Sequence, residues 1–239
     1  MNKRIKIITS AVICLVILVV SIVAFTPKSS VTILGNESYT PIYRGDASTN
    51  SVALTFNVYE NGEVVKGILN VLKQNGVKAT FFVGGCWADD NAEILNEIIL
   101  DGHELGNHGY FHKNHKKLSK EGNLREIDDN GKIVLALTGY KMNLFAPPSG
   151  AYSQTTLKVA ESLGYKTIMW SRDTIDWRDS DVNLIVNRAT NNISAGDIIL
   201  MHPKEHTLTA LPKIIENVKS KNLKMQTISK CCNLTSQEV

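Results

Sequence analysis

The fold of this chain is decided by a repeating unit that first appears as VALTF at residues 52–56 and again as ATFFV at residues 79–83. Both segments are short, apolar and rich in residues that favour strands. Between them, apolar residues recur at helical spacing from Val64 to Leu72, and Gly76 follows as a helix C-cap. This stretch therefore predicts a strand, a helix and a second strand.

The same alternation continues toward the C-terminus. Further strands are expected at 104–107, 142–145, 166–170, 198–201 and 225–228, and further helices at 94–99, 122–138, 182–193, 211–218 and directly after the N-cap Ser153. Parallel strands need crossover helices, so repeated strand–helix units predict an α/β fold with a parallel sheet. About seven such units favour a (β/α) barrel, although the pattern also allows an open doubly wound sheet.

The N-terminal part has a different composition. The nineteen residues from Ile7 to Phe25 carry no charge, and Lys3 and Arg4 precede them. A helix of that length spans the roughly 30 Å hydrocarbon core of a bilayer. We therefore expect a cytoplasmic stub (1–4), a transmembrane signal anchor (5–25), a stalk (26–47) and a domain outside the cytoplasm (48–235). This makes the chain a single-pass protein of the cell membrane; the alternative is a cleaved signal peptide and a secreted domain.

Charge and cysteine usage limit the possible partners. The chain has 26 Lys and Arg against 23 Asp and Glu, a net charge of only +3, and it has no basic stripe with interleaved aromatic residues. Nucleic acid binding is therefore not expected. Cys86 can form a disulfide with Cys231 or Cys232 in an oxidising compartment, and free thiols are the alternative.

Polar residues gather at the carboxyl ends of the predicted strands, where function lies in both candidate folds. His108 and His112 follow one strand, four residues apart, and a helical turn would place both imidazoles on one side, ready to share a metal ion. The alternative is a loop with two unrelated polar residues. His202 follows another strand and is either a site residue or a core histidine, whereas His103 and His115 are expected at the surface.

Five segments, in order, carry a resemblance to a known family. They are Leu54–Val58, Gly102–His112, Ala146–Gly150, Asp173–Trp177 and Leu200–His202. In that order they resemble the T-F-D-D, histidine, R-x-P-x-G, D-x-x-D-W and L-x-H motifs of the polysaccharide deacetylases, also called the NodB-homology domain or carbohydrate esterase family 4. The resemblance covers residues 48 to 230, and the histidine motif is its closest part.

This resemblance implies a distorted (β/α) barrel with fewer than eight strands. It also implies hydrolysis of N- or O-acetyl groups on a cell-wall polysaccharide such as peptidoglycan, assisted by a divalent metal of the Zn, Co or Ni type. By correspondence with the motifs, the metal ligands would be His108 and His112, the catalytic acid His202 with its partner Asp176, and the substrate-binding residues Pro148, Gly150, Tyr152 and Trp177.

The resemblance breaks down at three positions on one side of the site. Asn57 stands where the family has its general base, Val58 where it has a metal-binding Asp, and Ala146 where it has an Arg that orients the base. An amide has no useful basicity and valine cannot bind a metal. The primary hypothesis is a hydrolase of weak activity, in which either Glu60 replaces a lost carboxylate or the substrate needs less activation. The alternative is an inactive pseudoenzyme that binds glycan or a partner protein at the cell envelope.

Overall fold

The computed structural model describes residues 39–234, and its centre is a sheet of parallel strands. The strands are β1 (Ser51–Val58), β2 (Thr80–Val83), β3 (Glu104–Asn107), β4 (Leu144–Phe145), β5 (Lys166–Thr167), β6 (Arg172–Asp173), β7 (Ile198–Met201) and β8 (Lys224–Gln226). The order across the sheet is β5-β4-β3-β2-β1-β7-β6, and β8 pairs with β1 outside this path. Within the described residues β6 was not predicted, because two residues are too few to give a periodic signal.

The strand order decides between the two predicted architectures. Read as a circle, β1 to β7 follow one another in sequence, with an interruption between β5 and β6, which are the two edges of the path. A doubly wound sheet would instead reverse its order at a switch point. The expected α/β barrel of about seven parallel strands is therefore confirmed, in the form of an incompletely closed barrel.

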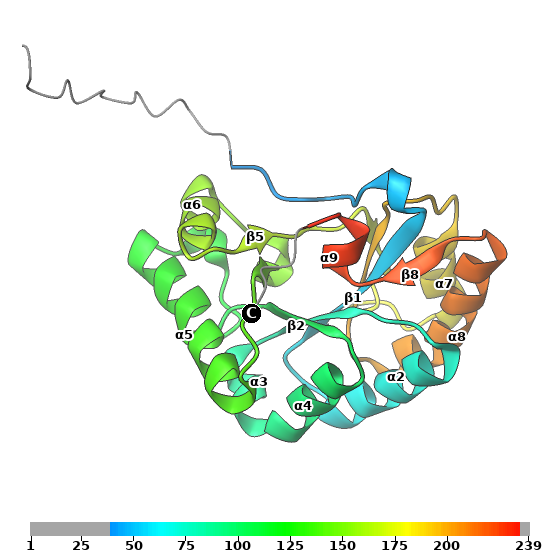
Figure 1. Ribbon diagram of the computed structural model, residues 1–239, viewed down its shortest axis with the longest axis horizontal. Coiled ribbons are helices and arrows are strands. Elements are labelled where there is room, and N and C mark those ends of the chain that lie inside the picture. Colours follow the sequence, from blue (N-terminus) through cyan, green and yellow to red (C-terminus); the bar gives the residue numbers. More distant parts are fainter. Residues whose placement is uncertain (1–38, 235–239) are drawn as a thin grey trace, which may run out of the picture. The chain divides into compact units, whose positions relative to one another are not determined.

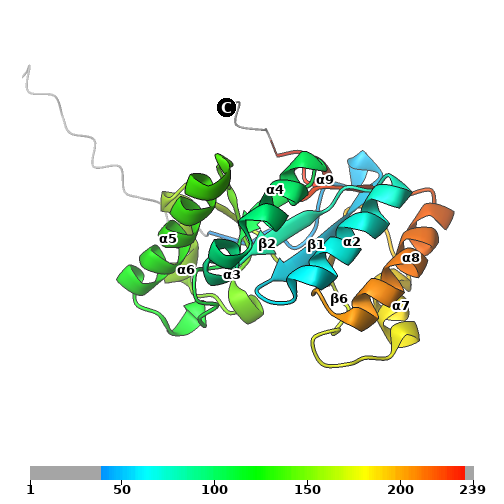
Figure 2. The ribbon, with the colours of Figure 1, turned by 90° about the horizontal axis from the view of Figure 1, so that it is seen from below.

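Helices cover the outer side of the strands except for the last helix, whose Ile228 and Cys231 pack with Ala53 and Phe82 in a second buried cluster. They are α2 (Gly62–Asn75), α3 (Gly85–Asp90), α4 (Ala92–Leu100), α5 (Lys120–Thr138), α6 (Gln154–Ser162), α7 (Val182–Thr190), α8 (Glu205–Ser220) and α9 (Ile228–Cys231), with short 3₁₀ turns at Ala47–Thr49, His115–Lys117 and Pro148–Gly150. Figures 1 and 2 both show α5, α4, α2 and α8 in one layer beside β1 and β2. The predicted caps are present: Gly76 has φ 66°, and Ser153 forms a capping box with Thr156.

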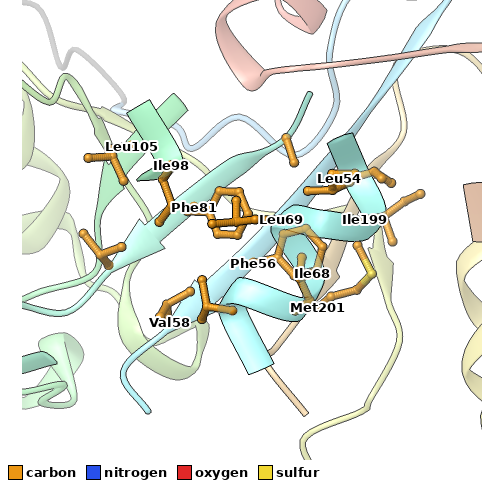
Figure 3. Close-up of a cluster of buried hydrophobic side chains, with 14 of the residues drawn as sticks. Leu54, Phe56, Val58, Ile68, Leu69, Phe81, Ile98, Leu105, Ile199 and Met201 are labelled. Atoms are coloured by element: carbon orange, nitrogen blue, oxygen red, sulfur yellow. The ribbon is translucent and has the colours of Figure 1, made fainter. Parts of the chain in front are cut away.

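The core between β1 and its helices follows from the alternation of side chains along a strand. Leu54, Phe56 and Val58 point to the same side, where they pack with side chains of α2 such as Ile68 (Figure 3). The residues between them, including Asn57, face the interior of the barrel. Val58 is 0% exposed, so the end of β1 contributes an apolar side chain to the core rather than a polar group to the strand ends.

The first described residues are attached to the barrel near its interruption. Ile42 bridges to Ile168, just beyond β5, and Arg44 bridges to Asp197, just before β7. Arg44 also forms an ion pair with the buried carboxylate of Asp197 at 2.7 Å, and Arg172 forms a second one at 2.8 Å. This part of the predicted stalk thus packs against the domain, because its backbone and charge are paired with it.

Two further expectations concern the remaining chain. The predicted anchor, residues 5–25, lies outside the described residues, and none of the helices between 39 and 234 is long and apolar enough to cross a membrane. Cys86, Cys231 and Cys232 are free thiols, so the free-thiol alternative holds for these three residues and the Cys86 disulfide is not formed.

Candidate active site

A cavity of about 320 Å³ opens at the carboxyl ends of the strands. Its walls are Asn57, Tyr59, His108, His112, Ser149, Trp170, Asp173, Trp177, Leu200 and His202. Among these are four residues that the sequence singled out for the site: the three histidines and Trp177. The structure thus brings the ends of β1, β3, β6 and β7 to one place, as expected for a barrel.

His202 and Asp176 form a tightly bonded pair. The Nδ1 of His202 donates to Oδ1 of Asp176 at 2.7 Å, while Oδ2 accepts the backbone N–H of His202 at 2.7 Å and the hydroxyl of Thr207 at 2.6 Å. Burial raises the pKa of Asp176, but the hydrogen bonds and charge of His202, together with the bond from Thr207, lower that pKa overall. The carboxylate therefore stays ionised and fixes the imidazole, which leaves Nε2 of His202 for a ligand.

The backbone before Asp176 is strained. Ile175 adopts φ 55°, the left-handed region that β-branched residues rarely enter, and its N–H donates to Oδ1 of Asp173 at 2.8 Å. Such strain persists only when the surroundings impose it, and it is frequent at functional sites. Here the turn brings Asp176 against His202 while Asp173 lines the cavity.

His108 and His112 lie close together in the wall of the same cavity. Their ring centres are 5.1 Å apart with the planes inclined by 58°. Nδ1 of His108 bonds to the carbonyl of Ala146 at 2.7 Å, which leaves Nε2 as the free nitrogen. The convergence agrees with the four-residue spacing, but its cause differs from the expected helical turn: His112 has φ 53° and the two residues lie in a loop.

Burial also sets the charge of these two rings. It holds the pKa of His108 well below its usual value of 6.5, and a positive charge on His112 would lower it further. The pKa of His112 is lowered by burial first and then by His202. Both imidazoles are therefore neutral near pH 7, which is the form that binds metals.

Helix α5 holds the loop that carries the two histidines, using a buried row of polar side chains. Nδ2 of Asn130 donates to the carbonyls of Val83 and Gly109 and to Oδ1 of Asn107, at 2.8, 3.2 and 2.9 Å. One turn earlier, Glu126 accepts the backbone N–H of Phe111 at 2.8 Å. The geometry of the histidine pair thus depends on a helix that lies outside the cavity.

The prediction that His115 and His103 lie at the surface was wrong. His115 was predicted at the surface but is 0% exposed, because its Nδ1 bonds to Asn123 of α5 at 2.8 Å and its carbonyl accepts the hydroxyl of Thr156. His103 was also predicted at the surface and is 5% exposed. Its Nδ1 accepts the N–H of Ala79 and burial lowers its pKa to about 4. Both residues are therefore core histidines bonded through Nδ1, and the Nε2 of each has no hydrogen-bond partner among the described residues.

The base and metal-carboxylate side of the site is neutral and apolar in this chain. Asn57 lines the cavity at 3% exposure, and its Oδ1 has no hydrogen-bond partner among the described residues. Val58 points into the main core, and Ala146 is a small apolar side chain in a separate buried cluster. Asp173, on the His202 side, is the one carboxylate among the residues that line the cavity.

Glu60 does not replace the missing carboxylates. It forms an ion pair with Lys204, in the loop after β7, while Glu63 pairs with Lys66 on the surface of α2. Within residues 39–234, no group of three His, Cys, Asp or Glu side chains is placed to hold a metal ion. Two neutral imidazoles remain, so the three-ligand metal site of the motifs does not fit the residues present here.

The segment after β4 contributes a residue to the cavity wall that was not among the predicted ones. Pro148 and Gly150 are not among the cavity walls; Ser149 between them is, with φ 55°. Tyr152 lies outside the walls as well, with its hydroxyl hydrogen-bonded to that of Tyr43 at 2.7 Å. These three residues were predicted to bind the substrate, but none of them lines the cavity.

The sequence analysis assigned no role to three wall residues, Tyr59, Trp170 and Leu200, although Leu200 lies in the segment that resembles the L-x-H motif. Tyr59 had a usable signal, since it lies two positions after Asn57 and therefore faces the same side of the chain. Its ring centre is 4.0 Å from that of His112. Leu200 and Trp170 belong to apolar stretches in which local pattern does not distinguish a cavity wall from the core.

Comparison with known proteins identifies the family. The sequence model of the polysaccharide deacetylases matches residues 44–168 of this chain. A peptidoglycan-N-acetylglucosamine deacetylase of Bacillus cereus is 34% identical over 197 residues, which cover 80% of this chain and 72% of that protein. The chain therefore belongs to the polysaccharide deacetylase family, as its motifs predicted.

Two other relatives refine this placement. The uncharacterized protein YlxY of Bacillus subtilis is 33% identical, and the match covers 82% of this chain but only 61% of YlxY. Among solved structures, BA3943 of Bacillus anthracis, described as a pseudoenzyme of carbohydrate esterase family 4, has a TM-score of 0.79 and 36% identity over 82% of this chain and 69% of that chain. A BA3943 mutant described as having restored enzymatic activity also has a TM-score of 0.79.

Proposed function

We propose that this chain binds an acetylated cell-wall glycan of the peptidoglycan type in the cavity and hydrolyses it far more slowly than an intact family member. The observation that carries the proposal is the asymmetry of the cavity: the His202–Asp176 pair is complete, whereas Asn57 and Val58 stand at the two carboxylate positions. The relatives named as peptidoglycan deacetylases support the class of ligand.

The residues present have clear chemical capacities. His202 can hold a proton at Nε2 and pass it to a leaving group, and Asp176 orients its ring and stabilises the charged form. Trp177 is 54% exposed at the rim and offers a flat face to a sugar. Asn57 can donate or accept hydrogen bonds but cannot take a proton from water. The site is thus equipped for binding and for the acid step, but not for activating the nucleophile.

The metal of the family would supply Lewis-acid polarisation of the acetyl carbonyl. Here only His108 and His112 are available to hold it, so we assign no step to it. Catalytic roles for His202 and Asp176 and a metal-binding role for the two imidazoles are part of this proposal. It also includes attachment to the cell membrane through residues 5–25, with the domain outside the cytoplasm.

The test measures binding and turnover on the same samples. Purified protein is titrated with N-acetylglucosamine oligomers by calorimetry and then assayed for released acetate, with the Bacillus cereus relative as reference. We expect binding that weakens in Trp177→Ala, and acetate release about 10²–10⁴ times slower than the reference, since a general base contributes about that much. Release at the reference rate, abolished by His202→Ala, would show that the site is a competent hydrolase.

The similarity to BA3943 favours the alternative that this chain is an inactive pseudoenzyme. A gain-of-function test distinguishes this alternative from a slow hydrolase. The changes Asn57→Asp, Val58→Asp and Ala146→Arg are introduced together, with circular dichroism to verify folding. If the neutral side is the cause of the low rate, acetate release rises in the triple variant while glycan affinity changes little. A folded triple variant with unchanged release would place the defect elsewhere. Absence of any glycan binding would instead contradict the binding role.

A further inference from the structure

The cavity wall carries one negative charge that has no partner of opposite charge. Asp173 is the single carboxylate among the described residues that line the cavity, and these include no Lys or Arg. Its Oδ1 accepts the backbone N–H of Ile175 at 2.8 Å. The nearby guanidinium of Arg178 is engaged by both carboxylate oxygens of Asp179, at 2.9 and 3.0 Å. Asp173 therefore lacks a counter-ion of its own.

The other groups of the wall add no net positive charge. The rings of His108 and His112 are neutral near pH 7, because burial lowers the pKa of each. His202 faces a counter-ion of its own, since its Nδ1 lies 2.7 Å from Oδ1 of Asp176. Whether this imidazole carries one proton or two, the pair with Asp176 has no net positive charge. The lining of the cavity is therefore negative.

Aromatic side chains make up much of the remaining wall. Tyr59, Trp170 and Trp177 line the cavity, and the two tryptophans lie three residues before and four residues after Asp173 in the chain. Aromatic faces attract organic cations, and Trp does so most strongly. Trp177 already meets one cation, since the guanidinium of Arg178 lies 5.8 Å from its ring centre, whereas Trp170 has no such neighbour among the described residues. A carboxylate in an aromatic wall favours an ammonium group over a neutral amide.

We propose that the cavity is a receptor for a free amino sugar and binds the deacetylated form of the glycan more tightly than the acetylated form. The ammonium group of the sugar pairs with Asp173 and lies against the ring of Trp170, and the polar side chains of Asn57 and Ser149 are available for its hydroxyl groups. An acetamido group in the same place is neutral and leaves the carboxylate without a counter-ion. This ligand class rests on the proposed function, since it requires that a cell-wall glycan occupies the cavity.

The proposed ligand also has a defined chemical origin. It arises when water cleaves the C–N bond of an acetamido sugar and leaves a free amine and acetate. Because Asn57 cannot take a proton from water, this chain forms the amine slowly at best. An active N-deacetylase must therefore supply the ligand.

The test compares three trisaccharides by calorimetry on the full-length protein. They are the β-1,4-linked trimers of glucosamine, of N-acetylglucosamine and of glucose, and the last shows what hydroxyl groups contribute alone. We expect the glucosamine trimer to bind about 10-fold more tightly than the acetylated trimer, as expected for a hydrogen bond to a charged group. The net charge of the whole chain is +3, so a general attraction for cationic sugars does not produce this preference.

Variants of the wall connect this preference to its source. Asp173→Asn should bring the affinities for the glucosamine and N-acetylglucosamine trimers together, while its amide oxygen can still accept the N–H of Ile175. Asp181→Asn is the matched control and should keep the preference, because it removes the same charge at the N-cap of α7, outside the cavity wall, where Asn caps as well as Asp. Trp170→Phe retains a ring that attracts cations less and should reduce the preference in part.

The outcomes separate this proposal from the proposed function. A wild-type protein that binds the N-acetylglucosamine trimer as tightly as the glucosamine trimer overturns the proposal, and this comparison needs no variant. A preference that survives in a folded Asp173→Asn variant also overturns it, and both results leave glycan binding itself intact. Failure of all three trimers to bind would contradict the proposed function and the amino-sugar receptor together.

Discussion

The two walls of the cavity differ in how their polar groups are satisfied. On the wall after β6 and β7, Asp176 accepts hydrogen bonds from His202 and Thr207, and every bond connects groups inside the domain. At the end of β1, Asn57 carries a buried amide whose Oδ1 has no partner among the described residues, and Val58 is part of the core. The wall with His202 and Asp176 thus contributes hydrogen bonds to the stability of the fold, whereas Asn57 contributes none through its Oδ1.

The largest expected loss of unfolding free energy comes from removing Asp176, the buried acceptor on the wall after β6 and β7. Asp176→Ala leaves the imidazole and the backbone N–H of His202 without their buried acceptor, and loss of one partner of such a pair costs about 3–5 kcal/mol of unfolding free energy. The measurement is urea unfolding at pH 7. Asp128→Ala is the control, because Asp128 pairs with Lys132 on the surface of α5, where a pair contributes only about 0.3–0.5 kcal/mol. Similar losses in both variants would contradict the comparison.

The second largest loss of stability is expected when the contact between α5 and the loop that carries His108 and His112 is removed. Asn130→Ala removes the buried Nδ2 donor that Val83, Asn107 and Gly109 share. The carbonyls of Val83 and Gly109 keep the bonds that they accept from backbone N–H groups, so the expected loss is about 1–3 kcal/mol. Imidazole resonances of His108 and His112 should shift in the same variant. Asn96→Ala changes an exposed residue of α4 and should alter the unfolding free energy by no more than about 0.5 kcal/mol. An unchanged stability in Asn130→Ala would mean that the loop does not need this support.

The two walls should also differ in their pH dependence. Burial lowers the pKa of His108, so the unfolded chain binds a proton that the folded chain refuses; stability is present above about pH 6.5 and falls as the pH drops. Asp176 has a lowered pKa too, and its contribution is lost only below about pH 4.

Unfolding free energies between pH 7 and pH 3 test this difference. Each such group contributes at most about 1.4 kcal/mol per pH unit. His108→Gln should flatten the decline between pH 6.5 and pH 4.5, whereas Asp176→Asn should flatten it only below pH 4. Equal effects of both variants in the upper range would remove the distinction between the walls.

The smallest effect is expected at the base position. Asn57→Ala removes an amide whose Oδ1 has no bond to lose within residues 39–234, so the unfolding free energy should change by about 1 kcal/mol or less. Asn107→Ala serves as the bonded counterpart, since Asn107 donates to the carbonyl of Ile127 at 2.7 Å and accepts from Gly109 at 2.8 Å. A loss in Asn57→Ala as large as in Asn107→Ala would show that Asn57 is structural.

Local sequence patterns predicted most of the fold. The strands at 104–107 and 198–201 match their predicted bounds, and the caps Gly76 and Ser153 lie where expected, because periodicity and capping depend on near neighbours in the chain. The elements that were missed, α3, α9 and β6, have six, four and two residues. Segments this short gain their structure from tertiary contacts, so the sequence holds no periodic signal for them.

The features of the candidate site also fall into those that the sequence predicts and those that only the tertiary structure decides. The sequence by itself determined the family, the intact His202 and Asp176, and the replacements at Asn57, Val58 and Ala146, because residue identity alone decides which chemistry a position can perform. Only the tertiary structure decided that His103 and His115 are buried, that Tyr59 covers His112 and that Glu60 is held by Lys204. Glu60 and Lys204 are 144 positions apart, and a partner that distant is chosen by the closure of the barrel and leaves no trace in local spacing.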